Sequence, residues 1–172
     1  MAAIDLPGLP ESADEVRLLW ALLDDTTRMR RAEAGPIAPA TLVWSPAPGM
    51  HSIGSVLMHI IDAEAYWIHE VLGGVARTPE ERTLHQADAT NQWNHQWANA
   101  PELDHAALLA LHDTVRERSK RLAGAFDDPA ATFPKAEGRF TLRWVLKHVA
   151  THEAYHYGQI EMLRQMHDRL AK

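Results

Sequence analysis

The sequence predicts an all-α protein folded as a four-helix bundle. Apolar residues recur every three to four positions in four long stretches, which is the period of an amphipathic helix. Prolines and paired glycines fall between these stretches, where they end helices. The chain has 172 residues, of which 46% are hydrophobic and 23% are charged. This size and composition fit one globular domain, which we expect to span residues 1–172.

The first helix is expected from about residue 12 to residue 31. It opens with Ser12-Ala-Asp-Glu15, a capping-box pattern in which each of the two outer side chains bonds a free backbone N–H. One apolar face follows at helical spacing, made of Val16, Leu19, Trp20 and Leu23. Residues 32–51 hold two glycines and four prolines, so we expect a connection without periodic structure there.

The second helix is expected from about Ser52 to Leu72, because Gly73 and Gly74 form a natural stop. Its apolar face carries Ile53, Val56, Ile60, Ala63 and Trp67. A long crossover follows over residues 75–102, and part of it has room for a helix. A connection this long allows the third helix to run parallel to the second.

The third helix is expected from about Leu103 to Ala123, with Asp104 as a possible N-cap. Its stripe is Leu108, Leu111 and Val115. Gly124 and residues 129–134 then break the chain. The fourth helix is expected from Thr141 to about Arg169, with one face made of Leu142, Val145, Leu146, Val149, His152, His156, Ile160 and Leu163.

Charge and composition argue against several kinds of partner. The net charge is −6 with His neutral, whereas a nucleic-acid binder needs a basic face. No stretch approaches the roughly 18 consecutive apolar residues of a membrane span. The first ten residues lack the basic flank and apolar core of a secretory signal. We therefore expect a cytoplasmic protein that binds neither nucleic acid nor membrane.

Histidine spacing is the most unusual feature of the sequence. The chain has 11 histidines, and three of them, His148, His152 and His156, lie four residues apart. Such a run is expected by chance only about 0.04 times in this composition. Residues four apart share a helix face, so two imidazoles at this spacing can bind one ion. The run falls on the expected buried face, where unpaired imidazoles are costly, and this favours a metal site.

The chain has no cysteine, so protein ligands must be His, Asp, Glu or backbone oxygen. Imidazole and carboxylate ligands suit Zn, Ni, Fe or Mn. His59 is the best candidate for a third ligand, because it borders the apolar face of the second helix. Facing helices of a bundle commonly hold a metal in this way. Three His ligands leave at least one coordination position open, as catalytic sites do.

The segment His152-Glu-Ala-Tyr-His156 also matches the H-E-x-x-H helix of metalloproteases. In the extended form of that motif, Gly and a third His follow, but here those positions hold Gln159 and Met162. Only 16 residues follow His156, too few for a second helix with a distant Glu ligand. We therefore reject the protease interpretation and keep the ligand geometry.

Two segments resemble the DinB family, also called DinB/YfiT-like. The first runs from Ser52 to Glu64 and reads Ser-Ile-Gly-Ser-Val-Leu-Met-His-Ile-Ile-Asp-Ala-Glu. The second runs from Thr141 to Gln159 and ends in His-Tyr-Gly-Gln. The distance between the segments and the overall length also match, so the resemblance covers nearly the whole chain.

The resemblance implies up-down-down-up topology for the four helices, with the long crossover between the second and third. It implies a divalent metal held by His59 from one helix and by His152 and His156 from another. His148 matches a position often occupied by His and is expected beside the ligands or at the rim of the site. Many relatives form homodimers. Characterised relatives include metal-dependent transferases and isomerases that use a low-molecular-weight thiol such as bacillithiol, mycothiol or glutathione.

The remaining polar and aromatic side chains have less specific interpretations. Glu153 is either a general base beside the metal or a solvated or supporting carboxylate. Asp62 and Glu64 are expected to form ion pairs or support the site rather than to bind the metal. Five histidines are expected at the surface, namely His69, His85, His105, His112 and His167. An aromatic cluster is expected to pack over one end of the bundle, made of Trp93, His95 and Trp97.

The leading functional hypothesis is a metal-dependent transferase or hydrolase with a small-molecule substrate. A metal at the histidine site lowers the pKa of a bound thiol or water and so makes a nucleophile at neutral pH. Since the chain has no cysteine, any thiol must come from a cosubstrate. Two alternatives stay open: a non-enzymatic metal-binding stress-response protein, and a helical bundle that binds a hydrophobic small molecule without metal.

Overall fold

The computed structural model describes residues 3–4, 13–85, 97, 102–135 and 138–170. Within these residues the chain is mainly helical, which confirms the predicted class. Its longest helices are α1 (Ala13–Ala34), α3 (Ile53–Glu64), α5 (His105–Ala123) and α6 (Leu142–Leu170). The helix α3 continues directly into η1 (Ala65–Leu72), a π-helix. No described helix is both long enough and apolar enough to cross a membrane.

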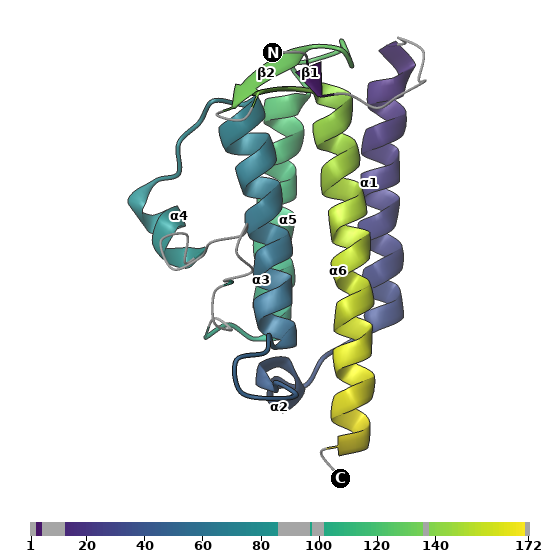
Figure 1. The fold of residues 1–172 in the computed structure, drawn as a ribbon, viewed down its shortest axis with the longest axis vertical. Helices are drawn as coiled ribbons and strands as arrows, with labels where there is room; N and C mark the ends of the chain where they lie inside the picture. The colour runs from purple at the N-terminus through teal and green to yellow at the C-terminus, as the bar shows by residue number, and fades with distance from the viewer. Residues whose placement is uncertain (1–2, 5–12, 86–96, 98–101, 136–137, 171–172) are drawn as a thin grey trace.

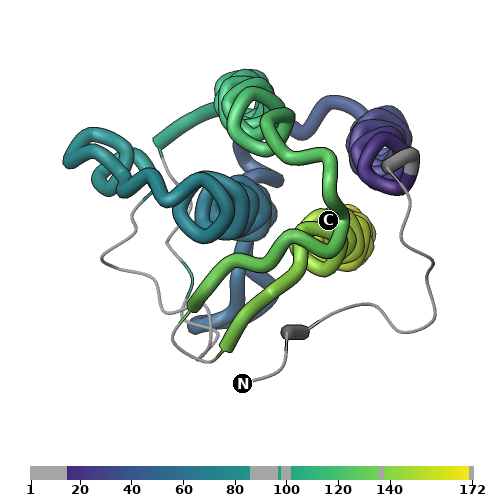
Figure 2. The backbone as a smooth tube through the Cα atoms, turned by 90° about the horizontal axis from the view of Figure 1, so that it is seen from above, coloured from purple at the N-terminus to yellow at the C-terminus, as the bar shows by residue number. Residues whose placement is uncertain are grey.

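The long helices lie side by side along the long axis of the molecule (Figure 1). α1 and α6 run in one direction, whereas α3 and α5 run in the other. α6 packs against both α1 and α3, and α5 packs against α3 and η1. Seen end-on, the four helices stand at the corners of a quadrilateral, with α6 between α1 and α3 (Figure 2).

The core follows the apolar faces that the sequence predicted. In α1 the buried apolar side chains include Val16, Leu19 and Leu23. Every residue of α3 is buried, as expected for a helix that is apolar around most of its circumference. Two clusters of buried apolar residues result, one toward each end of the helices. The polar side chains of α3 are therefore forced into the interior, where each must find a partner.

Helix caps explain where several helices begin. Asp104 accepts a hydrogen bond from the backbone N–H of Ala107 at 2.8 Å, which confirms it as the N-cap of α5. Ser52 caps α3 in the same way through the N–H of Ser55, at 3.2 Å. The predicted cap of the first helix, Ser12, lies outside the described residues.

Two short helices lie in the predicted connections. α2 (Pro39–Val43) forms within residues 32–51, so the prediction of a connection without helical structure was wrong there. A proline at the first helical position needs no hydrogen-bond partner for its nitrogen, and Leu42 is buried; both favour this turn. α4 (Pro79–Leu84) lies in the crossover and begins with a capping box between Thr78 and Glu81.

A small sheet covers the end of the helices where α6 begins (Figure 1). Its strand order is β1-β3-β2, from β1 (Ala3–Ile4), β2 (Thr132–Lys135) and β3 (Gly138–Thr141). β2 and β3 are antiparallel and pair Phe133 with Phe140, two buried rings. The sequence predicted only a break in the chain here, because strands this short show no measurable alternation.

Candidate metal centre

Three imidazoles meet between α3 and α6. The Nε2 atom of His152 lies 3.0 Å from Nε2 of His59 and 3.0 Å from Nε2 of His156. All three ligand atoms lie within 4.8 Å of one another. His152 and His156 are one turn apart on α6, and His59 faces them from the middle of α3. The sequence spacing and the helix packing together therefore produce a three-histidine group that could hold a metal ion.

The second ring nitrogen of His156 fixes its tautomer. Nδ1 of His156 lies 2.7 Å from Oε1 of Gln159, and because that oxygen can only accept, Nδ1 carries the hydrogen. The lone pair of His156 therefore sits on Nε2 and faces the group. Gln159 is itself oriented, because its amide nitrogen donates to the hydroxyl of Tyr155 at 3.3 Å. Such an outer partner is typical of metal-binding histidines.

Burial keeps two of the three imidazoles neutral. Burial and, to a smaller extent, the neighbouring imidazoles lower the pKa of His152 to about 2. Burial also lowers the pKa of His156, although the hydrogen bond that its Nδ1–H donates to Gln159 acts in the opposite direction. Neutral imidazole is the form that binds a metal, so the site is ready for a cation at neutral pH.

The spacing of the three nitrogens suits a small divalent ion. Zn–N distances near 2.0–2.1 Å place two tetrahedral ligand atoms about 3.3 Å apart. The two shortest separations here, at 3.0 Å, are close to that value. One hydrogen on His152 Nε2 can serve only one of its two neighbours, whereas a central cation would satisfy three lone pairs at once. The residues present therefore fit a metal such as zinc.

Aromatic rings form a wall beside the histidines. The indole ring of Trp97 stacks on His59, with ring centroids 4.1 Å apart and planes 9° apart. His51 stacks on Trp97 at 4.1 Å, so the indole lies between two imidazoles. No sequence pattern predicted this stacking, because His51 and Trp97 lie in two different segments between the long helices. Trp93 and His95, predicted to cluster with Trp97, lie outside the described residues.

His148 lies beside the group but not in it. Its ring stacks on Trp144 at 4.7 Å, and its centroid is 5.7 Å from that of His152. Burial and two neighbouring lysines lower the pKa of His148 to about 4. Of the two expected positions, beside the ligands or at the rim of the site, the contact with His152 agrees with the first.

The acidic candidates form ion pairs in the interior. Asp62 pairs with Arg77, and Glu64 pairs with Arg116, which confirms the expectation of ion-paired groups. Glu153 is buried and accepts from Thr27 at 2.9 Å and from Arg116 at 3.0 Å. The carboxylate is therefore not solvated, and its Oε2 is engaged by partners on α1 and α5.

Three histidines that were expected at the surface are buried, so that prediction was wrong for them. Nε2 of His112 lies 3.3 Å from Glu64, and Nδ1 of His85 lies 3.6 Å from Asp62. His69 donates from Nε2 to the carbonyl of Val115 at 3.2 Å. Each imidazole has a polar partner from another segment of the chain, which periodicity within one helix cannot reveal. His105 and His167 are half-buried.

Comparison with known proteins identifies the family. The sequence profile described as mycothiol-S-transferase matches residues 18–169, which include both histidine-bearing segments. The chain belongs to the mycothiol-S-transferase family. This family is part of the DinB/YfiT-like superfamily, so the resemblance drawn from the two helix motifs is confirmed.

The chain is also similar to the uncharacterized protein YkkA of Bacillus subtilis (strain 168). The two chains are 24% identical over 166 residues, which is 94% of this chain and 93% of the relative. The likeness therefore extends over both proteins rather than over one motif.

Proposed function

We propose that this protein is a metal-dependent S-transferase that uses a low-molecular-weight thiol of the mycothiol type. The observation that supports the proposal most is the convergence of His59, His152 and His156 through their Nε2 atoms. Family membership supports the thiol part of the proposal.

The three histidines are the proposed ligands of a divalent ion, with Zn, Ni, Fe or Mn compatible with an all-nitrogen set. Such an ion lowers the pKa of a bound thiol and so supplies a thiolate at neutral pH. Burial favours the neutral form of His152 and His156. Gln159 orients the ring of His156, and Trp97 shields one face of His59 from water.

The thiol must come from a cosubstrate, because the chain has no cysteine. In the proposed transfer its sulfur forms a bond to an electrophilic carbon of the second substrate. The leaving group departs with its electron pair, and the thiol proton passes to solvent. The side chains of this chain contribute binding and orientation but no covalent intermediate.

We also propose that α1, α3 with η1, α5 and α6 form the up-down-down-up bundle of the superfamily. The helix directions in Figure 1 and the packing of α6 against α1 and α3 support this topology. In such a bundle Trp97, from the segment between η1 and α5, lies against His59 on α3.

The first test is elemental analysis of untagged protein purified without a nickel column, beside the His152→Ala/His156→Ala double variant. We expect about one metal ion per chain in the natural protein and none in the variant. The second step measures conjugation of mycothiol to 1-chloro-2,4-dinitrobenzene, with and without a chelator, and with glutathione as the comparison thiol.

The outcomes separate the alternatives. Metal with thiol conjugation supports the transferase. Metal without conjugation by any thiol leaves a metal-binding protein whose ion joins the helices. Absence of metal from correctly folded natural protein overturns the proposal and leaves a helical protein that binds a ligand of another kind.

A further inference from the structure

A buried arginine joins all four long helices. Arg116 of α5 bonds both carboxylate oxygens of Glu64 on α3, from Nε at 2.8 Å and from Nη2 at 2.9 Å. Nη2 also donates to Oε2 of Glu153 on α6, at 3.0 Å. Nη1 donates to Thr27 at 3.0 Å and to Asp24 at 3.2 Å, both on α1. All five N–H groups of the guanidinium are therefore used.

The two acidic partners lie close to the histidines along the chain. Glu64 follows His59 by five residues, which is about 7.5 Å along the axis of α3. Glu153 directly follows His152 on α6. One guanidinium thus joins the two helices that carry the proposed ligands.

Burial makes this connection stiff. Glu64 and Glu153 are each only 1% exposed. Burial by itself raises the pKa of Glu64, but Arg116 and His112 hold it below its ordinary value, so it stays charged. Glu153 uses Oε2 alone, because Oε1 has no hydrogen-bond partner among the described residues. Removing one member of such a buried pair is far more disruptive than removing a surface pair.

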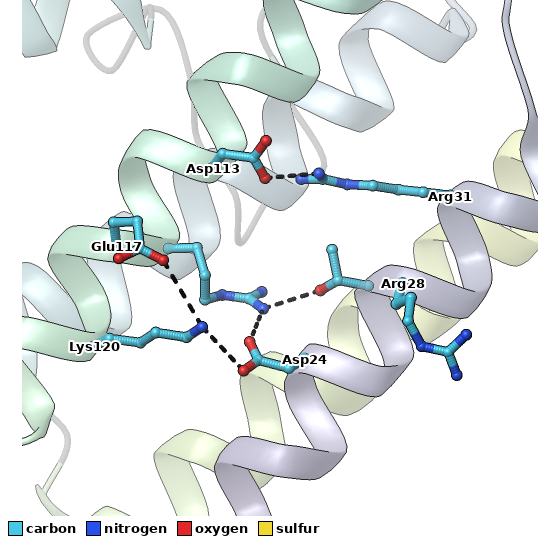
Figure 3. A pocket seen from close by; sticks show the side chains of 8 residues that line it. Asp24, Arg28, Arg31, Asp113, Glu117 and Lys120 are labelled. Atoms are coloured by element: carbon cyan, nitrogen blue, oxygen red, sulfur yellow. Dashed lines mark hydrogen bonds and ion pairs between the residues drawn. The ribbon is translucent and has the colours of Figure 1, made fainter.

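The outer bonds of Arg116 belong to a separate surface groove. Arg116 and Thr27 line a groove of about 480 Å³ between α1 and α5, together with charged residues of both helices. In Figure 3, Lys120 reaches across it to Asp24, and Arg31 reaches across it to Asp113, at 3.0 Å and 2.7 Å. Asp24 is 43% exposed in its side chain, whereas the inner partners are buried. Arg116 therefore makes inner bonds to the buried carboxylates of Glu64 and Glu153, and outer bonds to Thr27 and Asp24 at the groove.

We propose that Arg116 is a positioning residue for the metal centre. It holds Glu64 and Glu153 at a fixed separation, and so holds α3 and α6 at the distance that brings His59 against His152 and His156. This inference rests on the proposed metal site. It assigns Arg116 no contact with metal or substrate.

The test compares cobalt(II) binding by the natural protein, Arg116→Lys and Asp24→Asn. Lysine keeps the charge but cannot form the planar fork that bonds two carboxylates. We expect Arg116→Lys to weaken cobalt affinity at least about tenfold and to change the visible d–d spectrum of the bound ion. Asp24→Asn removes only the charge from the outer contacts with Arg116 and Lys120, so cobalt affinity should stay within about twofold and the spectrum should not change.

Glu64→Gln provides a second variant of nearly identical size, to be used if Arg116→Lys does not fold. We expect Glu64→Gln to change the d–d spectrum of the bound cobalt in the same direction as Arg116→Lys does. A folded Arg116→Lys or Glu64→Gln variant with the natural affinity and spectrum overturns the inference, even if its melting temperature is lower. A natural protein that binds no cobalt overturns the metal site itself, which is a different result.

Discussion

At the scale of single residues, the hydrogen-bond partner of one ring nitrogen decides which nitrogen of an imidazole can bind a metal. Gln159 performs this role for His156, and it lies three residues later on the same helix face. The sequence contained this signal, because the residue belongs to the motif that resembled the DinB family. Its hydrogen bond could be recognised only once the side chains had been placed.

Gln159→Leu should lower metal affinity about tenfold, because the ring of His156 loses the acceptor that orients it. Gln159→Glu is the matched control, since it keeps an acceptor at the same distance and should keep the affinity. Both are measured by competition against a chelator of known affinity. Equal affinities for the leucine and glutamate variants would show that the hydrogen bond does not orient the ligand.

His69 should make stability depend on pH. Burial is the main cause that lowers its pKa to about 4, and nearby Arg118 adds to it. In the unfolded chain the group titrates near its ordinary value of 6.5. Between these two pH values the unfolded state binds a proton that the folded state refuses, so stability is lost as the pH falls.

His69→Gln keeps a hydrogen-bond donor for Val115 but cannot titrate. We expect the variant to bind about one proton fewer on unfolding between pH 4 and 6.5. Urea unfolding at a series of pH values gives this number from the slope of the free energy of unfolding against pH. Parallel slopes for the two proteins would contradict the assignment to His69.

Interior polar residues mark the limit of prediction at this scale. The i, i+4 spacing was sufficient to place His152 and His156 on one face. It gave no information on His112, whose acceptor Glu64 is 48 positions away in the chain. Pairings of this kind depend on which helices become neighbours, and periodicity within one helix does not record that.

At the scale of elements, the long helices could be predicted because each carries a continuous apolar stripe and a recognisable stop or cap. The predicted second helix corresponds to α3 and η1 together, and its predicted end before Gly73 is confirmed. There the N–H of Gly73 bonds the carbonyl of Ile68, five residues back, as in a π-helix. α2 and the strands were not predicted, because elements of two to five residues are stabilised mainly by tertiary contacts.

The N-cap of α5 should contribute measurably to stability. Asp104→Ala leaves the N–H of Ala107 without its side-chain acceptor and is expected to cost about 1 kcal/mol. Asp104→Asn keeps an acceptor oxygen and should lose much less. Urea denaturation of both variants measures the difference. Equal losses would mean that the charge, rather than the hydrogen bond, stabilises the helix start.

At the scale of the whole molecule, the histidine group joins segments that are far apart in the sequence. His59 and His152 are separated by 93 positions, so a shared ion would cross-link α3 to α6 in the folded state alone. A ligand that binds only the folded state stabilises it in proportion to the logarithm of its concentration over its dissociation constant. Arg116 also joins α3 to α6, through Glu64 and Glu153. The arginine and a bound ion should therefore both hold these two helices together.

Saturating zinc should raise the melting temperature of the natural protein. At about 100 times the dissociation constant the gain is about 2.7 kcal/mol, or roughly 5–10 °C for a chain of this length. His59→Ala removes the ligand on α3 and should abolish most of the shift, because the ion then binds α6 alone. His148→Ala should keep the full shift, since that ring stacks on Trp144 outside the group. A His59→Ala variant with an undiminished shift would mean that the stabilising ion does not bridge the two helices, and the cross-link would have to be abandoned even if zinc binds elsewhere.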